Sequence, residues 1–495
     1  MILRTVTIFC AAIFLFASNA LANEFGNLGI SNRDLQLARE AYRFSKNEDW
    51  QNAREAAQQA SDPIIYKIIL WREFKEARNT SSSDIKKFLE ENKDWPLRDQ
   101  FSRRIGIYTK NPDSQSSWKA LASRARDLLE EGNPQDAFDS IKNKYKNYNG
   151  EARSEALWLA GWIALRYLKD PNTAVEYFDR QFREAGTPIT KARAGYWAGR
   201  AYEQGGDQAR ASAWYTQAAR HPTYFYGQLA ALRMNDDYTL ELPDYSAPNN
   251  IDANNFLADE RIRSARILDA LGDTTNPRLF LLKFLDEDGR TVSDYLLVVM
   301  LAQQTTNYEW AVMAGKKAAQ VEVQIPHANY PVLMYEPQYI EKALMMAIIR
   351  QESQLNRYAK SSAGAAGMMQ LMPSTAENVA KMVGTDYSYE RLFEKDYNMM
   401  LGSFYLGKRV KDFDGSYILA IASYNAGIGN VKTWVNRFGD PRQLRSLEEV
   451  VDWMEQIPFG ETRNYVQRVM ENLQVYRARI NGNRHKLMLY KDLFR

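Results

Sequence analysis

Cysteine and histidine are almost absent from this 495-residue chain. The single cysteine, Cys10, lies in an apolar segment near the N-terminus, and the three histidines are far apart in sequence, without the spacing of metal ligands: His221, His327 and His485. If that segment is removed on export, the remaining chain has no thiol, which excludes disulfides, thiolate catalysis and cysteine metal ligands. We therefore expect no metal site and no cofactor.

The chain also lacks a predominant charge. It has 64 basic residues against 61 acidic ones. A dedicated nucleic-acid-binding protein needs a strong basic field, so we expect no nucleic-acid partner. Aromatic residues make up 12% of the sequence, and core packing is the default explanation for them.

Long hydrophobic runs are missing except at the N-terminus. Arg4 precedes an apolar run over residues 6–17, and Ala20-Leu21-Ala22 has small residues at the two positions that a signal peptidase reads. Residues 1–22 are therefore predicted to be a cleaved export signal. An uncleaved membrane anchor is the less favoured alternative, because the run is short for a membrane span. No later segment is long enough to cross a bilayer, so no transmembrane segment is expected in the mature chain.

Helical periodicity dominates residues 31–235. Two apolar stripes separated by a polar break predict a helical hairpin: Leu35, Ala38, Ala41 and Tyr42, then Trp50, Ala53, Ala57 and Ala60. Further on, Gly161 and Tyr177 recur as Gly199 and Tyr215, both after 38 residues. Small residues let helices approach closely while large aromatics fill the next layer, as in tetratricopeptide-like stacks. The N-terminal half is predicted to be an irregular α-superhelix of degenerate helical repeats.

Two breaks divide the chain further, a stretch without periodicity at 242–250 and the prolines Pro326 and Pro331. The sequence thus predicts a mainly all-α protein in five parts. These are a signal peptide (1–22), an α-superhelical domain (23–245), a helical linker domain (246–325), a C-terminal domain rich in methionine and glycine (326–484), and a tail (485–495). The basic tail either docks on the superhelix or stays loose.

Glu352 closes an apolar stripe in the C-terminal domain. Ile340, Leu344 and Ile348 repeat every four positions and put Glu352 next on the same helix face. A carboxyl group there is expected to be partly buried, and desolvation favours its protonated form, as a general acid requires. Periodicity alone fits a solvated glutamate at the end of a core helix even better, because most glutamates lie at the surface.

The sequence after Glu352 is rich in small residues. Glycines and alanines in the segment 361–373 leave room for a ligand to approach the backbone. Ser374-Thr375-Ala376-Glu377 then fits a capping box that starts a new helix. Two more segments follow: 422–429 ends an apolar helix with Gly427 as its predicted stop, and 457–466 opens a helix with acidic residues near its positive end.

In this order, these segments resemble the catalytic domain of the soluble lytic murein transglycosylases, within the lysozyme-like superfamily. The resemblance covers residues from about 326 to 480 and rests on four motifs: Arg350-Gln351-Glu352-Ser353, the segment 364–376, Tyr424-Asn425-Ala426-Gly427, and Ile457-Pro458-Phe459 with Glu461-Thr462-Arg463 and Tyr465. The upstream helical half looks, in a generic way, like the superhelical and linker regions of the large periplasmic members. The resemblance implies a lysozyme-like C-terminal α domain and a periplasmic protein.

The resemblance also implies a reaction: cleavage of the β-1,4 bond between N-acetylmuramic acid and N-acetylglucosamine in peptidoglycan, ending in a 1,6-anhydro sugar without water. Glu352 matches the family's single acid/base. Ordinary glycosidases use two carboxylates, and with no obvious second one here, the substrate's acetamido group would stabilise the oxocarbenium-like centre. The residues implied in substrate binding are Ser361, Gln370, Met372, Tyr424, Asn425, Glu461 and Tyr465. For Met372 and Tyr465, core packing is an equally good interpretation.

Two alternative functions stay open. A goose-type muramidase would use the same fold and the same glutamate, with water as the acceptor. A non-catalytic periplasmic scaffold would hold partner proteins on the superhelix and glycan on the C-terminal domain. The expected partner is the peptidoglycan glycan strand, with proteins of the cell-wall or secretion machinery as further candidates.

Overall fold

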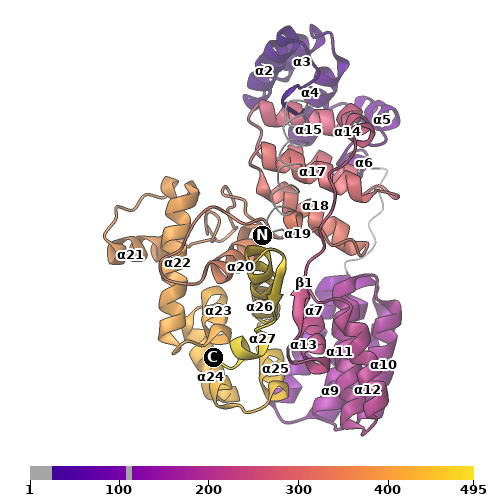
Figure 1. Ribbon diagram of the computed structural model, residues 1–495. Coiled ribbons are helices and arrows are strands. Elements are labelled where there is room, and N and C mark those ends of the chain that lie inside the picture. Colours follow the sequence, from indigo (N-terminus) through magenta and orange to yellow (C-terminus); the bar gives the residue numbers. More distant parts are fainter. Residues whose placement is uncertain (1–24, 78, 107–113) are drawn as a thin grey trace, which may run out of the picture. The chain divides into compact units, whose positions relative to one another are not determined.

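The structure is a computed structural model that describes residues 25–77, 79–106 and 114–495 (Figure 1). Helices dominate these residues, and the two short strands β1 (Thr239–Glu241) and β2 (Arg484–Lys486) pair antiparallel. The predicted all-α class is confirmed. Within the described ranges, no helix is both long and apolar enough to cross a membrane. The predicted export signal and Cys10 lie outside the described residues.

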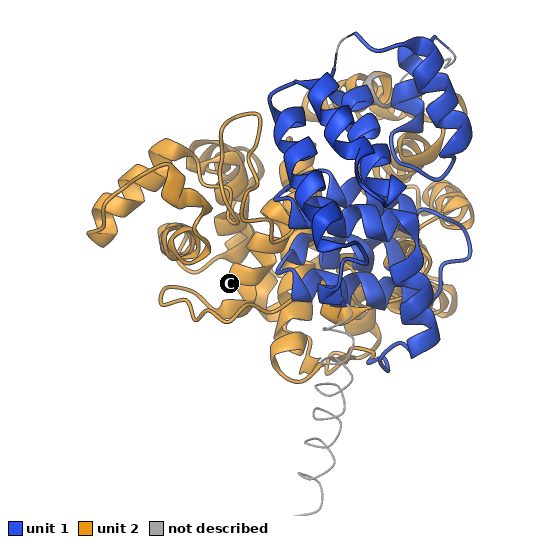
Figure 2. Ribbon diagram, turned by 90° about the horizontal axis from the view of Figure 1, so that it is seen from above, with its two compact units in different colours: residues 1–111, 244–318 blue, residues 112–243, 319–495 orange. Residues whose placement is uncertain are grey.

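The chain divides into two compact units, each built from two separate stretches of sequence (Figure 2). The first unit comprises residues 1–111 and 244–318, and the second comprises residues 112–243 and 319–495. The domain boundaries drawn from the sequence stay predictions.

The first unit consists of short helices around an aromatic core. Its helices are α2 (Asn32–Lys46), α3 (Trp50–Gln58), α4 (Pro63–Glu76), α5 (Ser82–Glu91), α6 (Arg98–Arg104), α14 (Asn250–Ala258), α15 (Glu260–Ala270), α16 (Pro277–Leu285), α17 (Val292–Gln304) and α18 (Tyr308–Gln320). The predicted hairpin is confirmed by α2 and α3, which pack together. The rings of Trp71 and Trp95 contact Phe280 with centroid separations of 4.8 and 5.0 Å, so α4 and α16 share one core.

The second unit begins with stacked helix pairs. Its first elements are α7 (Ser114–Glu130), α8 (Pro134–Ile141), η1 (Lys144–Asn147), α9 (Gly150–Arg166), α10 (Pro171–Glu184), α11 (Pro188–Gln204), α12 (Gln208–Ala219) and α13 (Phe225–Met234). A Cβ atom on Gly161 would lie 2.7 Å from the ring of Phe178, and one on Gly199 would lie 2.6 Å from the ring of Tyr215. The glycine recurrence is therefore a packing repeat, because only a residue without a side chain lets these rings approach.

One part of the predicted repeat is wrong. The aromatic partner of Gly161 is Phe178, not Tyr177, because the turn between α9 and α10 is one residue longer than the turn between α11 and α12. The hydroxyl of Tyr177 instead donates a hydrogen bond to the Lys142 carbonyl at 2.6 Å. The second helix of the α9–α10 pair is thus one residue out of phase with the second helix of the α11–α12 pair.

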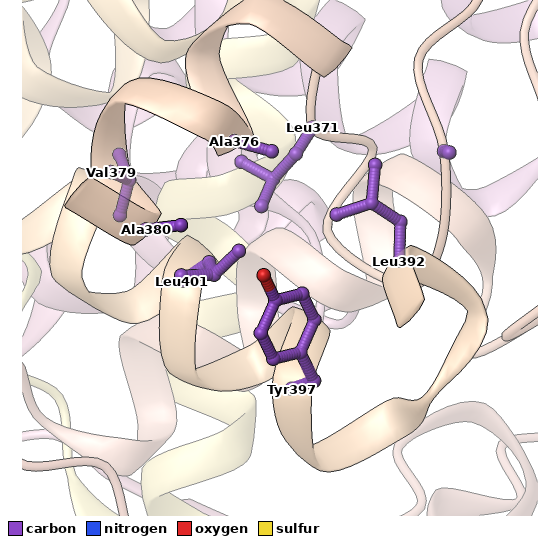
Figure 3. Close-up of a cluster of buried hydrophobic side chains, with 8 residues drawn as sticks. Leu371, Ala376, Val379, Ala380, Leu392, Tyr397 and Leu401 are labelled. Carbon is purple, nitrogen blue, oxygen red and sulfur yellow. The ribbon is translucent and has the colours of Figure 1, made fainter. Parts of the chain in front are cut away.

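The C-terminal part of the second unit carries the four motifs. Its elements are α19 (Pro326–Asn329), α20 (Lys342–Ser353), α21 (Pro373–Val383), η2 (Glu390–Phe393), α22 (Lys395–Asp412), α23 (Tyr417–Ala426), α24 (Ile428–Phe438), η3 (Pro441–Gln443), α25 (Leu447–Gln456), α26 (Gly460–Ile480) and α27 (Leu489–Leu493). Helices α20 and α26 pack side by side (Figure 1). A small hydrophobic cluster, with Leu371, Val379, Leu392 and Leu401 among its members, joins α21 and α22 to the loop that follows α20 (Figure 3).

The C-terminal tail is docked within the second unit. In strand β2, Lys486 pairs with Thr239 of β1, and the short helix α27 buries Leu489 and Leu493. Asp492 is also buried and forms an ion pair with Arg477 of α26 at 2.5 Å. The tail is therefore docked and not loose, but its main partners are strand β1 and the C-terminal helices α23, α25 and α26 and not the superhelical repeats that were predicted to bind it.

Buried carboxylates hold the helical repeats against the C-terminal helices. Asp452 of α25 pairs with Arg200 of α11 at 2.9 Å, and Glu471 of α26 accepts a hydrogen bond from the Phe225 backbone N–H at 2.7 Å. Removing one partner of such a pair leaves an uncompensated charge, which is strongly destabilising. These contacts explain why residues 112–243 cluster with residues 319–495.

Candidate active site

Glu352 lies in the last turn of α20, where the helix is stopped by a left-handed residue, Gln354, with φ of 54°. Leu344 and Ile348 are fully buried on the same face, whereas Ile340 precedes the helix, which begins at Lys342. The Glu352 side chain is half-buried. Its desolvation raises the pKa of the carboxyl group to about 7.

Tyr465 of α26 is the hydrogen-bond partner of Glu352. Its hydroxyl donates to Glu352 Oε1 at 2.6 Å, and its ring is buried. Burial raises the pKa of Tyr465 well above its ordinary value, so the phenol remains a donor at neutral pH. This hydrogen bond partly opposes the rise in the Glu352 pKa, while the charge of Glu461 adds to it. In the described part of the chain, no cationic side chain lies within ion-pair distance of Glu352, so its acid form is not suppressed.

Tyr424 lies near the carboxyl group but is held by the loop. Its hydroxyl donates to the Met369 carbonyl at 2.7 Å, and the side chain is half-buried in α23. Burial raises the pKa of Tyr424, and the charge of Glu352 contributes to that shift, which places the two groups in the same electrostatic environment. Tyr424 and Glu352 are thus close enough to interact electrostatically, but the Tyr424 hydroxyl donates its hydrogen bond to the loop and not to Glu352.

Asn425 and Glu461 come from the two neighbouring motifs. Asn425 Oδ1 accepts a hydrogen bond from Thr462 Oγ1 at 2.6 Å, which fixes the amide and ties the end of α23 to the first turn of α26. Glu461 is exposed in that same turn. Gly427, with φ of 84°, ends α23 as predicted.

The three residues predicted from the glycine-rich loop have different environments. Ser361 Oγ accepts from the Ala365 N–H at 2.9 Å, and the Gln370 amide donates to the carbonyls of Ala359 and Gly367 at 3.0 and 2.8 Å. Both side chains therefore stabilise the loop itself. Met372 is 41% exposed, so core packing is the wrong interpretation for this residue. For Tyr465 the core interpretation holds only in part, since the ring is buried but the hydroxyl serves Glu352.

Asn398 of α22 fixes the loop backbone, and sequence reasoning missed it. Its side chain is fully buried and accepts from the Met369 N–H at 2.8 Å while donating to the carbonyls of Ala366 and Leu392 at 3.1 and 2.9 Å. A Cβ on Gly367 would lie 2.1 Å from the Leu392 carbonyl oxygen, so only glycine fits beside this contact. The sequence signal that could have identified Asn398 is an amide side chain inside an otherwise apolar stretch of helix.

The predicted capping box after the loop is wrong. Helix α21 begins at Pro373, its N-cap is Met372, and no side chain caps it. Proline is favoured at the first helical position, where its missing N–H costs nothing. Ser374 therefore lies inside the helix instead of preceding it.

Two family models match this chain. The transglycosylase SLT domain matches residues 335–445, and the soluble lytic transglycosylase helical domain matches residues 456–484. The first match contains Glu352 and Tyr424, and the second contains Tyr465. The C-terminal region of the chain is thus similar to the soluble lytic transglycosylases.

Named soluble lytic murein transglycosylases are similar to about half of the chain. A soluble lytic murein transglycosylase of Salmonella typhimurium is 32% identical over 283 residues, which cover 53% of this chain and 40% of the relative. The protein of the same name in Escherichia coli strain K12 is 31% identical over 263 residues, which cover 51% of this chain and 39% of the relative. The matched regions thus span about two fifths of these relatives.

A solved structure has a similar fold. The lytic transglycosylase Slt of Pseudomonas aeruginosa, determined as an inactive variant, superposes with a TM-score of 0.58 and 22% sequence identity. The match covers 95% of this chain and 71% of that protein. Within the described residues, no group of three or more His, Cys, Asp or Glu side chains is arranged to hold a metal ion.

Proposed function

We propose that this protein is a periplasmic lytic transglycosylase that cleaves the β-1,4 bond between N-acetylmuramic acid and N-acetylglucosamine in peptidoglycan. The observation that carries the proposal is the environment of Glu352. Its carboxyl group is half-buried, its pKa is raised to about 7, and it has a neutral phenol as its hydrogen-bond donor. A group with a pKa near the working pH can both give and take a proton. The names and domain matches of the relatives support the same reaction class.

In the proposed reaction, Glu352 first protonates the glycosidic oxygen, and the bond from that oxygen to the muramoyl C1 breaks. The oxocarbenium-like centre at C1 is stabilised by the substrate's own acetamido group. The Glu352 carboxylate then takes the proton of the 6-hydroxyl as O6 bonds to C1. Glu352 is regenerated, no water is consumed, and the product carries a 1,6-anhydro ring.

This scheme requires no second catalytic carboxylate. Glu461 is the nearest acidic residue by motif, and its charge acts on Glu352, but it is exposed and therefore well solvated. In the proposal Glu461 positions substrate, together with the polar and apolar groups around the loop: Ser361, Gln370, Met372, Tyr424, Asn425 and Tyr465. Tyr465 holds the Glu352 carboxyl group in place.

Glu352→Gln tests the proposal directly, because glutamine keeps the shape of the side chain but cannot transfer the proton. We expect the variant to fold and to release muropeptides about 10² to 10⁴-fold more slowly from purified murein. Glu377→Gln is the matched control, since Glu377 is an exposed residue of α21 paired with Lys381. Near-normal release by Glu352→Gln would overturn the assignment.

Mass spectrometry of the products separates the competing functions. Transglycosylation gives products one water lighter than those of hydrolysis. Products at the hydrolytic mass would identify a goose-type muramidase, and no release by the wild-type protein would identify a non-catalytic scaffold.

A further inference from the structure

A buried cluster of polar side chains joins the helical repeats to the start of α26. At its centre lies Glu455, a fully buried carboxylate in the last turn of α25. Arg193 of α11 and Arg463 of α26 approach Glu455 Oε2 at 3.7 and 3.5 Å. Gln467 of α26 donates to Oε1 at 2.8 Å, and the Tyr226 hydroxyl of α13 donates to the same oxygen. Two repeat helices and the first turns of α26 therefore meet at one carboxylate.

The same turns of α26 carry Tyr465, the hydrogen-bond donor of Glu352. Arg463 and Gln467 are four residues apart, so they lie on one face of the helix. Tyr465 is two residues from each and lies on the opposite face, about 200° around the helix axis from Arg463. The contacts agree, since one face binds Glu455 and the other reaches Glu352 at 2.6 Å. The rotation of α26 about its axis therefore sets the position of the Tyr465 hydroxyl.

The start of α26 is held from two sides. Arg463 Nη1 donates to the Ile457 carbonyl at 2.7 Å, which closes the turn between α25 and α26. Thr462 donates to Asn425 of α23 at 2.6 Å. The α23 contact lies within the C-terminal helices, whereas the contact through Glu455 leads to the repeats.

Arg193 is itself held firmly by the repeats. Its guanidinium pairs with Glu155 of α9 at 2.7 Å and lies over the Trp158 ring, 3.6 Å from the centroid. A guanidinium that is both paired and stacked on an aromatic ring is restrained in position. Glu455 therefore faces a fixed cation.

The cluster is better suited to fixing geometry than to adding stability. Among the described residues, Glu455 Oε2 and the Nε atoms of Arg193 and Arg463 are buried without a hydrogen bond. Buried charges with incomplete hydrogen bonding pay a desolvation cost, and well-packed apolar residues are often equally stabilising. Each charge nevertheless keeps its partner close, and here the partner is the start of α26.

We propose that Arg193 is a positioning residue for the reaction at Glu352, acting through Glu455 and the start of α26 on the Tyr465 hydroxyl. Arg193 touches neither the substrate nor Glu352 in this scheme. The inference rests on the proposed function and deepens it, because it gives the helical repeats an effect on proton transfer.

Arg193→Gln in the full-length chain tests the inference. We expect kcat on purified murein to fall about threefold to tenfold with little change in KM, since a displaced Tyr465 orients Glu352 less well. The basic limb of the kcat/KM profile should move upward, because the Tyr465 hydrogen bond lowers the Glu352 pKa and is weakened in the variant. Arg193→Lys keeps the charge that faces Glu455 and should restore most of both values.

Arg200→Gln is the control for lost stability. Arg200 follows Arg193 by two turns on α11 and pairs at 2.9 Å with Asp452, one turn before Glu455 on α25. The variant thus breaks a buried ion pair between the same two helices, but among the described residues Asp452 pairs with Arg200 and Arg166 and not with α26. Its basic limb should stay in place. Equal shifts in the Arg193 and Arg200 variants, or lost activity in Arg193→Gln without a shift, would overturn the inference.

A double variant identifies the route of the effect. If Arg193 acts through Tyr465, Arg193→Gln should change kcat and the basic limb little further once Tyr465 is replaced by phenylalanine. Glu461 and Tyr424, the other titratable groups that interact with Glu352, are the same in all these variants. Additive effects would mean that Arg193 acts by its own charge or through the fold at large, and would contradict the inference.

Tyr226→Phe serves if Arg193→Gln does not fold, since it removes a hydrogen bond from the repeats to Glu455 without removing a charge. A smaller upward shift of the basic limb is expected, and an unmoved limb would overturn the inference. Glu352→Gln separates this inference from the proposed function. Near-normal turnover by Glu352→Gln would overturn both, whereas an inactive Glu352→Gln with Arg193→Gln behaving like Arg200→Gln would overturn only the role of Arg193.

Discussion

Glu352 and Glu455 are both sheltered glutamates in the second unit, and their surroundings differ. Glu455 is fully buried, lies near Arg193 and Arg463, and accepts hydrogen bonds from the Gln467 amide at 2.8 Å and from a tyrosine hydroxyl. Glu352 is less buried, and among the described residues it accepts one hydrogen bond, from the neutral hydroxyl of Tyr465. The difference teaches that burial alone does not make a catalytic acid. The cations beside Glu455 can pair with its charge, whereas Glu352 has no such partner among the described residues, and desolvation raises its pKa.

The comparison predicts opposite effects on stability, and the largest is expected at Glu455. Glu455→Gln removes the negative charge that faces Arg193 and Arg463, so two buried guanidinium groups lose their shared partner. Breaking a buried ion pair in this way costs about 3 to 5 kcal/mol of unfolding free energy. Urea unfolding at pH 7 would measure the loss, with Glu377→Gln as the exposed control. A change no larger than in the control would mean that Glu455 is not the structural anion inferred here.

Glu352→Gln should instead stabilise the protein at high pH. The pKa of Glu352 is raised from 4.5 in the unfolded chain to about 7 in the fold, so its contribution to stability is fully present at low pH and is lost as pH rises. Above pH 7 the wild-type fold must hold a desolvated carboxylate, and glutamine relieves that cost, by about 1 to 3 kcal/mol after discounting for partial exposure.

Thermal unfolding of the wild type and Glu352→Gln at pH 5 and pH 9 would check this prediction. At pH 5 both side chains are largely neutral in the fold, so the two melting temperatures should nearly coincide. At pH 9 the variant should melt at a higher temperature. Equal melting temperatures at both pH values would contradict the raised pKa.

Tyr465→Phe removes the hydrogen bond that orients Glu352. We expect kcat to fall about tenfold with little change in KM, because the carboxyl group loses its position but the sugar contacts remain. The hydroxyl of Tyr465 lowers the Glu352 pKa, so its removal should also move the basic limb of the pH profile of kcat/KM upward from about 7.

Tyr476→Phe is the matched control for that experiment. Tyr476 lies on the same helix and is fully buried, and its hydroxyl has no hydrogen-bond partner among the described residues. Its removal should leave kcat and the pH profile unchanged. If the two phenylalanine variants behaved alike, Tyr465 would be a packing residue and not a positioning one.

The sequence predicted much of this arrangement but could not separate the two glutamates. Leu344 and Ile348 precede Glu352 at four-residue intervals, and Leu447 and Val451 precede Glu455 in the same way. The apolar stripe therefore predicts a partly buried carboxylate in both helices. What distinguishes them is the set of partners, and Arg193 lies more than 250 residues before Glu455 in sequence. Only the resemblance to a known family pointed to Glu352.

Predictions from local sequence patterns were wrong where the structure depends on a residue distant in sequence or on the exact position at which a helix begins. The capping box was misplaced because Pro373 takes the first helical position, and Tyr177 was chosen over Phe178 because a turn is one residue longer. Asn398 was missed because two of its partners, the Ala366 carbonyl and the Met369 N–H, lie about thirty residues earlier in sequence. The helices themselves, including the end of α23 at Gly427, followed from periodicity and helix-stop residues.

Glu461 offers the finest test of the electrostatic contrast between the two glutamates. Its negative charge is the smaller of the two causes that raise the Glu352 pKa, after desolvation. Glu461→Gln should therefore lower that pKa and shift the basic limb of kcat/KM downward by a fraction of a pH unit, since an exposed charge is strongly screened. Glu461→Asp keeps the charge and should leave the limb near its wild-type position, even if KM changes through lost substrate contacts.

The pH shift caused by Glu461→Gln should shrink as salt is added, because screening weakens the interaction of Glu461 with Glu352 but not the desolvation of Glu352 itself. An upward shift, or one that is unaffected by salt, would mean that Glu461 acts on Glu352 through structure and not through its charge.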